Sequence, residues 1–191
     1  MQLNIIDYFL IFLLVLAVYY DLTRRKIPNR ITMPAILIGI TWSTVNSGLS
    51  GFLFSIFGFL FGLTVFLIPY MSGGMGAGDV KLMAAIGALK GWKFTLFSSL
   101  GTAVAGGVIV IIYMIYNGSM KKTMINVLGL IVKPLAKYIF KVSGNQIAYK
   151  IVKFFDNNEN IKVKNYIPYA LAIAIGSFYI LFSNISYLFY I

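Results

Sequence analysis

The sequence contains no cysteine and no histidine, and only five of its 191 residues are acidic. The absence of cysteine excludes disulfide bonds, thiol catalysis and cysteine-ligated zinc. With histidine missing as well, we expect no transition-metal site, and nothing in the sequence calls for a metal or another cofactor. Any chemistry that this chain performs must therefore use oxygen or amine groups.

Apolar residues dominate the chain, because 60% are hydrophobic and only 11% are charged. A bilayer core of roughly 30 Å is crossed by about 20 apolar residues in a helix. Runs near this length occupy residues 4–20, 31–46, 51–71, 94–116 and 166–191, with a shorter run at 80–89. Lys90, Trp92 and Lys93 follow the short run and are interpreted as anchors at the membrane interface. The sequence predicts an all-α integral membrane protein of about six transmembrane helices, in a single domain over residues 1–191.

Lysine and arginine are unevenly distributed between the connections. Four of them follow the first apolar run and nine lysines lie within residues 117–165, whereas residues 46–50 carry no charge. Short loops rich in these residues stay on the cytoplasmic side. We therefore expect a multi-pass protein of the cytoplasmic membrane with its N-terminus outside. Membrane topology explains the net charge of +11, so we do not expect nucleic-acid binding.

The basic cytoplasmic loop at residues 117–165 has the pattern of an interfacial helix. Residues 123–155 mix apolar positions with lysines, and Lys133, Lys137 and Lys141 recur at every fourth position. A helix of this kind lies on the anionic inner leaflet, where each cation contributes roughly 1 kcal/mol. Anionic lipid is therefore an expected partner of this loop.

Two of the five acidic residues, Asp21 and Asp79, lie at the ends of apolar runs. An ionisable group at the edge of hydrocarbon is costly and is by default a functional-site candidate. The predicted topology carries the chain across the membrane twice between them, so both reach the cytoplasmic face. The other three are interpreted as solvated: Asp7 at the start of the first helix, and Asp156 and Glu159 in a polar loop.

Two carboxyl groups within a few ångströms cannot both ionise cheaply, so one keeps its proton while the other stays charged. The charged partner can deprotonate a water as it attacks a peptide carbonyl, and the protonated partner can stabilise the developing oxyanion. The two titrations would be coupled and belong to the pair. Asp21 and Asp79 are therefore predicted to form an acid–base pair for hydrolysis.

Four glycines precede Asp79, at positions 73, 74, 76 and 78. Glycine permits positive φ and a close approach of other backbone. Irregular backbone at membrane depth is tolerated where it lines protein or water, which suits a cleft that a substrate strand could enter. Taken alone, the glycines favour a flexible turn or small-residue helix packing; the attached aspartate reverses this in favour of the cleft.

At this point the motifs resemble those of the type IV prepilin and preflagellin peptidases, a family of membrane aspartyl proteases. The GxGD motif that holds the family's second catalytic aspartate reads here Gly76, Ala77, Gly78 and Asp79. The first aspartate is followed in the family by a basic stretch and IPN, present here as Asp21, Arg24, Arg25, Lys26, Ile27, Pro28 and Asn29. A third similarity is the segment from Ile167 to Gly176, IPYALAIAIG.

The resemblance implies that Asp21 and Asp79 are the catalytic pair of an endopeptidase. The resemblance also implies that this endopeptidase cuts a short basic leader from pilin- or archaellin-like precursors at the cytoplasmic face. Residues that match the motifs around the pair are Gly76, Gly78, Pro28, Asn29, Lys81 and Pro168. Bifunctional bacterial members also methylate the new N-terminus through a cysteine-rich domain. No extension precedes the first apolar run and no cysteine is present, so we expect cleavage without N-methylation, as in small archaeal-type or tight-adherence-type members.

Several alternatives remain open on the residues alone. Presenilin-like proteases share the GxGD logic but have a longer fold with more spans. A proton-coupled transporter would also place Asp21 and Asp79 in the membrane, and proton-linked flux without proteolysis would identify it. A non-catalytic subunit of a pilus assembly machine would keep the same fold without activity. Lys81 is interpreted as an interfacial lysine rather than a catalytic partner, because positions i and i+2 of a helix face different sides.

Overall fold

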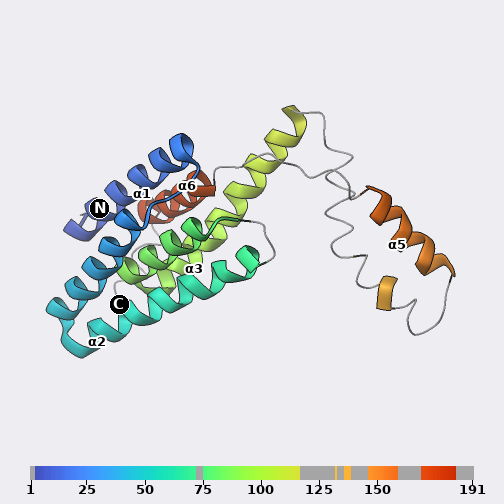
Figure 1. The fold of residues 1–191 in the computed structure, drawn as a ribbon. Helices are drawn as coiled ribbons and strands as arrows, with labels where there is room; N and C mark the ends of the chain where they lie inside the picture. Colours follow the sequence, from blue (N-terminus) through green and yellow to red (C-terminus); the bar gives the residue numbers. More distant parts are fainter. Residues whose placement is uncertain are drawn as a thin grey trace. The chain divides into compact units, whose positions relative to one another are not determined.

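The computed structural model describes residues 3–71, 75–116, 132, 136–138, 146–158 and 169–183. All regular secondary structure in these ranges is helical, so the all-α prediction is confirmed for them (Figure 1). The chain divides into two compact units, residues 1–108 with 167–191 and residues 109–166. The second unit coincides closely with the predicted basic loop.

Helix α1 (Ile5–Arg24) has well-defined ends. At its start, Asn4 and Asp7 form a capping box, in which the Asn4 backbone N–H donates to Asp7 Oδ2 at 2.9 Å. At its end, Arg25 adopts a left-handed conformation with φ 53°, and its N–H donates to the Asp21 carbonyl at 2.9 Å. At 20 residues the helix is about 30 Å long, enough to cross a bilayer core.

Helix α2 (Asn29–Met71) contains 43 residues, more than twice the number that a crossing requires. It is interrupted at Gly48, which has φ 59° and ψ −137°, and there the chain folds back on itself (Figure 1). The backbone of Ser43 comes so close to Gly51 that no Cβ would fit there. The break divides α2 into two antiparallel apolar segments that match the predicted runs 31–46 and 51–71.

Helix α3 (Ala77–Tyr116) has 40 residues and is broken in the same way at Gly91, with φ 76°. The ring of Phe54 occupies the space where a Cβ of Gly91 would lie, so both backbone conformation and packing require glycine. The segment before the break contains the predicted short run 80–89, and its side chains are almost completely buried. α1, α2 and α3 are each long and apolar enough to cross a membrane, and α6 (Tyr169–Phe182) is a shorter apolar helix.

Small residues bring the helices of the first unit into close contact. The backbones of Gly58 in α2 and Gly87 in α3 approach so closely that a Cβ on either would lie 2.0 Å from the carbonyl oxygen of the other. Ser55 Oγ lies nearby, 3.1 Å from the Gly39 carbonyl oxygen and 2.8 Å from that of Ala88. Small residues let membrane helices pack backbone to backbone in this manner.

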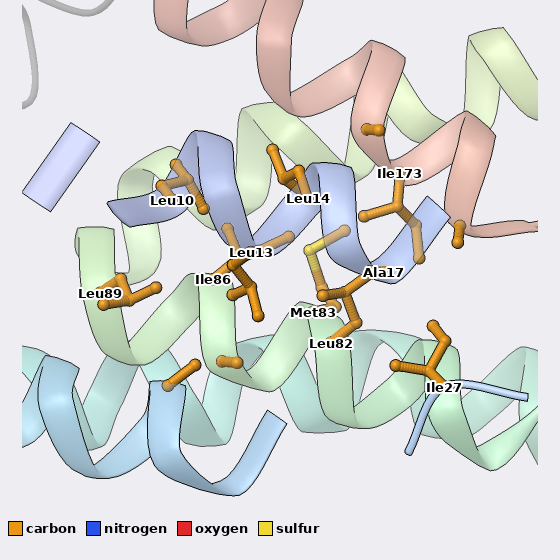
Figure 2. Packing of buried hydrophobic residues seen from close by; sticks show 14 of the residues in the cluster. Leu10, Leu13, Leu14, Ala17, Ile27, Leu82, Met83, Ile86, Leu89 and Ile173 are labelled. Atoms are coloured by element: carbon orange, nitrogen blue, oxygen red, sulfur yellow. The ribbon is translucent and has the colours of Figure 1, made fainter. Parts of the chain in front are cut away.

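Helix α1 packs antiparallel against the first segment of α3 through a stripe of apolar side chains (Figure 2). Figure 2 shows Leu10, Leu13 and Ala17 following one another along α1 while Leu89, Ile86 and Met83 follow in the same direction along α3, and all six belong to one buried cluster. Ile173 of α6 joins the same core. This interface matters for the site because its ends carry charged residues.

Two sequence interpretations are wrong at one end of this interface. The sequence predicts a solvated Asp7 and a Lys90 that anchors at the membrane surface, but their side chains are only 2% and 7% exposed. Lys90 Nζ lies 2.6 Å from Asp7 Oδ1 in a buried ion pair. Each charge offsets part of the desolvation cost of the other, which permits burial of both. Trp92 and Lys93, by contrast, are exposed.

In the second unit, helix α5 (Gln146–Asn158) is amphipathic. At 100° per residue, Ile147, Ile151 and Phe154 share one side, Lys150 borders that side and Lys153 lies beyond it. Ile147 and Phe154 are exposed in this unit. Most of the predicted 123–155 segment, including Lys133 and Lys141, lies outside the described residues.

Candidate active site

Asp21 is in the last turn of α1, on the face that packs into the core. Asp7, Leu10, Leu14, Ala17 and Asp21 recur at alternating spacings of three and four residues, and all five are buried. The Ala170 backbone N–H donates to Asp21 Oδ2 at 3.1 Å. Ala170 lies in the first turn of α6, so the positive end of that helix dipole is directed at the carboxylate.

Asp79 lies in the first turn of α3 and is 6% exposed. Its backbone N–H donates to the Gly76 carbonyl oxygen at 3.1 Å, and its Oδ2 accepts from the Gly76 N–H at 3.0 Å. The carboxylate thus reaches back over the helix start, as the acidic residue of a capping box does. This bond holds the side chain and caps the helix with negative charge at its positive end.

The fold brings Asp21 and Asp79 within electrostatic range of each other, although they lie on different helices. Each carboxylate is held by a backbone N–H at the first turn of a helix, α6 for Asp21 and α3 for Asp79. Two buried carboxyl groups that interact electrostatically resist simultaneous ionisation. The arrangement has the elements of an acid–base pair.

The residues that surround the pair in sequence also contact each other across the fold. A Cβ on Gly78 would lie 3.0 Å from Ile27 Cβ, so this glycine leaves the space that Ile27 fills. Lys81 Nζ donates to Asn29 Oδ1 at 2.9 Å, in a partly exposed position. These contacts tie the segment after Asp21 directly to the segment around Asp79. Pro28 accepts the N–H of Ile31 at the start of α2, and Pro168 lies outside the described residues.

Two features of the site were not predicted from the sequence. Tyr169, the first residue of α6, is partly buried and lies within electrostatic range of Asp79. Its only signal was its place within the third similarity, directly after Pro168. The second is the ion pair of Asp7 with Lys90. Here the spacing was informative, because Asp7 precedes Asp21 by two heptads and therefore lies on the same helix face.

A cleft of about 700 Å³ opens at the opposite end of the α1–α3 interface from the two aspartates. Its lining includes Trp42, Phe54, Phe94 and Lys90, with several amide and hydroxyl side chains. Neither Asp21 nor Asp79 contributes to it. This hollow is therefore separate from the candidate active site.

Known proteins are similar to this chain over the region that contains the motifs around Asp21 and Asp79. The model of the type IV leader peptidase family matches residues 8–111, which is more than half of the chain and includes both aspartates. The chain is also 31% identical over 121 residues to the prepilin leader peptidase/N-methyltransferase of Legionella pneumophila. That alignment covers 60% of this chain and 42% of the relative, so the chain spans less than half the relative's length. No solved structure matches.

Proposed function

This chain belongs to the type IV leader peptidase family, and on that premise we propose that it is a membrane aspartyl endopeptidase. Its substrates are pilin- or archaellin-like precursors, from which it removes the short basic leader. The observation that carries the proposal is that Asp21 and Asp79 lie within electrostatic range of each other, each held by a backbone N–H. The direct contacts between the two motifs support the same assignment.

The proposed reaction needs only this pair and water. The ionised carboxylate takes a proton from a water as the water oxygen attacks the carbonyl carbon of the scissile peptide bond. The protonated carboxyl group donates a hydrogen bond, and then its proton, to the carbonyl oxygen. When the tetrahedral intermediate collapses, the C–N bond breaks and the amide nitrogen receives the proton held by the first carboxylate. At the same time one hydroxyl of the intermediate returns its proton to the second carboxylate and becomes the carbonyl of the product acid. One acid and one base are regenerated, so the pair turns over without a cofactor.

We place the reaction at the cytoplasmic face of the cell membrane. In the proposed topology the breaks at Gly48 and Gly91 divide α2 and α3 into four apolar segments, which with α1 and α6 make six. With the N-terminus outside, the end of α1 and the start of α3 then lie on the cytoplasmic side with Arg24 and Arg25. A leader with its own positive charge would remain in the cytoplasm and present its cleavage site there.

The test is cleavage of a pilin-like precursor in membranes that contain this protein or its variants. Asp21→Asn and Asp79→Asn keep the size of the side chain and remove its acid–base function. We expect each to lower the rate at least about 1,000-fold. Asp156→Asn serves as the matched control, because the proposal gives that carboxylate no role. Cleavage at the normal rate by either active-site variant would refute the aspartate pair.

We also propose that the product is not methylated. The name of the Legionella relative includes an N-methyltransferase, and the cysteine-rich part expected of bifunctional members has no counterpart in a chain without cysteine. Mass spectrometry of the mature substrate tests this. The new N-terminus should have the mass of the unmodified residue, even when the methyl donor S-adenosylmethionine is supplied.

The amphipathic helix α5 supports a further part of the proposal, contact with anionic lipid. Its apolar side chains would enter the interface while Lys150 and Lys153 face phosphate groups. In anionic nanodiscs, an added protease should cleave within residues 117–165 faster in the double variant K150Q/K153Q than in the wild type, because the loop is held less tightly on the lipid surface. Equal protection of both proteins in anionic and neutral lipid would contradict this contact.

A further inference from the structure

The buried ion pair lies at the opposite end of the same interface as the two candidate catalytic residues. We refer to Asp7 and Lys90 as the ion-pair end of the α1–α3 interface and to Asp21 and Asp79 as its aspartate end. A buried ion pair is weak evidence for added stability, because desolvation offsets much of the attraction. Its best-supported use is to set the register between two helices.

The geometry of the interface makes such a role specific. On α1, 14 residues separate Asp7 from Asp21, which corresponds to about 21 Å of helix. On α3, 11 residues separate Asp79 from Lys90, or about 17 Å. Between the two ends the contacts are between apolar side chains (Figure 2). Such contacts are non-directional and are partly preserved when one helix slides along the other, whereas a 2.6 Å ion pair is not.

Both members of the ion pair are themselves attached to fixed points of the backbone. Asp7 accepts the Asn4 N–H through Oδ2 while Oδ1 faces Lys90, so its carboxylate is held at the start of α1. Lys90 directly precedes Gly91, where α3 breaks and the Phe54 ring packs against the backbone. The bond therefore joins the first turn of one helix to the break in the other.

We propose that Asp7 and Lys90 are positioning residues whose ion pair sets the register of α1 against α3, and thereby the separation of Asp21 and Asp79. This inference rests on the proposed peptidase function, in which that separation decides whether the two carboxyl groups share a proton. Neither Asp7 nor Lys90 contacts the substrate or the attacking water in this assignment. Their effect reaches the reaction only through the two helices.

A simpler role would be mutual neutralisation of two charges that happen to be buried. The two roles predict different results when both charges are removed together. If the two charges only neutralise each other, each single variant leaves one charge buried without its partner. The double variant D7N/K90M then removes that remaining charge and regains full activity. If the pair sets the register, the double variant regains stability but not the geometry of the aspartate end.

The experiment compares D7N, K90M, D7N/K90M and K90R in the full chain. Asn retains an oxygen that can accept the Asn4 N–H, so D7N removes the charge and leaves the cap. We expect D7N, K90M and the double variant to lower kcat for precursor cleavage about tenfold or more with KM little changed, because the substrate contacts are intact. K90R, which retains the cation, should stay within about threefold of the wild type. Lys93→Met, an exposed lysine three residues further on, is the matched control.

A second measurement reports the register without any catalysis. The chain has no cysteine of its own, so spin labels on Leu22→Cys and Ala77→Cys, both exposed, report the distance between α1 and α3 at the aspartate end. The distance distribution should shift or broaden in D7N, K90M and the double variant, and stay unchanged in K90R and Lys93→Met. An unchanged distribution in the first three, or wild-type kcat in the double variant, overturns the positioning role. If the wild type cuts no precursor, the proposed function fails, while the label distances still decide the register.

Discussion

The two ends of the α1–α3 interface share a local construction and differ in what faces it. At the ion-pair end, Asp7 accepts the backbone N–H of the residue three positions earlier at 2.9 Å. At the aspartate end, Asp79 does the same at 3.0 Å. Across the interface, Asp7 forms an ion pair with the ammonium of Lys90, whereas Asp79 has the carboxyl group of Asp21 within electrostatic range. One capping geometry thus serves a structural contact at one end and a candidate reactive pair at the other.

The difference follows from electrostatics in a medium of low dielectric constant. An ammonium beside a buried carboxylate attracts it, and Asp7 and Lys90 form a directional contact of 2.6 Å. A carboxyl group beside a buried carboxylate has the opposite effect, because two negative charges repel and one proton is retained. The residue opposite an aspartate, rather than the residues next to it in sequence, decides which role the aspartate has.

The largest expected effect comes from making the aspartate end resemble the ion-pair end. In Asp21→Lys an ammonium would face Asp79 and hold it as a carboxylate, with no proton to share. Precursor cleavage should fall at least about 1,000-fold. A cleavage assay in membranes measures this, with Asp7→Asn as the comparison that retains residual activity. A cleavage rate of Asp21→Lys close to that of the wild type would show that a shared proton is not required.

The next largest effect is expected in the pH dependence of cleavage, which reports on the two carboxyl groups of the aspartate end. At low pH both members of the aspartate end are protonated and the base is lost, so the rate falls. At high pH both are ionised and the acid is lost, so the rate falls again. Each limb should have a slope of about tenfold per pH unit, with apparent pKa values that belong to the pair. Initial rates in detergent across the pH range measure it, and a rate that rises on one side to a plateau would contradict a shared proton.

A more moderate effect is expected at Gly87, between the two ends, where backbone contact holds α3 against α2. A Cβ at Gly87 would lie 2.0 Å from the Gly58 carbonyl oxygen, and backbone can relieve such an overlap only by moving. Gly87→Ala should lower the free energy of unfolding by about 1–3 kcal/mol. Thermal unfolding in detergent measures this.

The matched control for that change is Gly107→Ala, in the same helix. No atom lies within 4 Å of a Cβ at Gly107, so this variant should be as stable as the wild type or slightly more stable. Equal loss of stability in both variants would show that glycine flexibility, and not the close contact, matters at Gly87.

The smallest effect is expected at the hydrogen bond between Lys81 and Asn29. The bond is partly exposed, so its loss removes little free energy. Asn29→Ala and Lys81→Met should each lower kcat/KM about threefold, by loosening the contact between the two motifs. Asn29→Asp keeps an acceptor for the ammonium and should retain activity. A loss above about 100-fold in Lys81→Met would instead indicate direct participation of that lysine in the reaction.

Much of the helical architecture was predictable from apolar runs alone. The uncharged segments gave the helices to within a few residues, and Gly48 and Gly91 interrupt α2 and α3 between predicted runs. The segment at 80–89 was harder, because an apolar run in a membrane protein has the same composition whether it faces lipid or other helices. Burial of that run became clear only when α1 and α2 were seen to pack around it.

The candidate site was predictable where its residues were rare. Asp21 and Asp79 were conspicuous as acids at the ends of apolar runs, and the motifs around them specified their neighbours. Tyr169 was not singled out, because an aromatic residue at a helix start is common in such a chain. Asp7 and Lys90 were misinterpreted because a charge near the end of a span is ordinarily solvated.

By itself, then, the sequence predicted an integral membrane protein, most of its helices and the two candidate catalytic aspartates. Composition and helical period are local properties of the chain. The spacing of two heptads between Asp7 and Asp21 also puts them on one face of α1, although Asp7 was interpreted as solvated. Only the tertiary structure decided that Lys90 pairs with Asp7 and that Asp21 comes within electrostatic range of Asp79. Those pairings depend on how α2 folds back at Gly48 and how α3 returns along α1, and no spacing within one helix specifies the residue that will lie across from it.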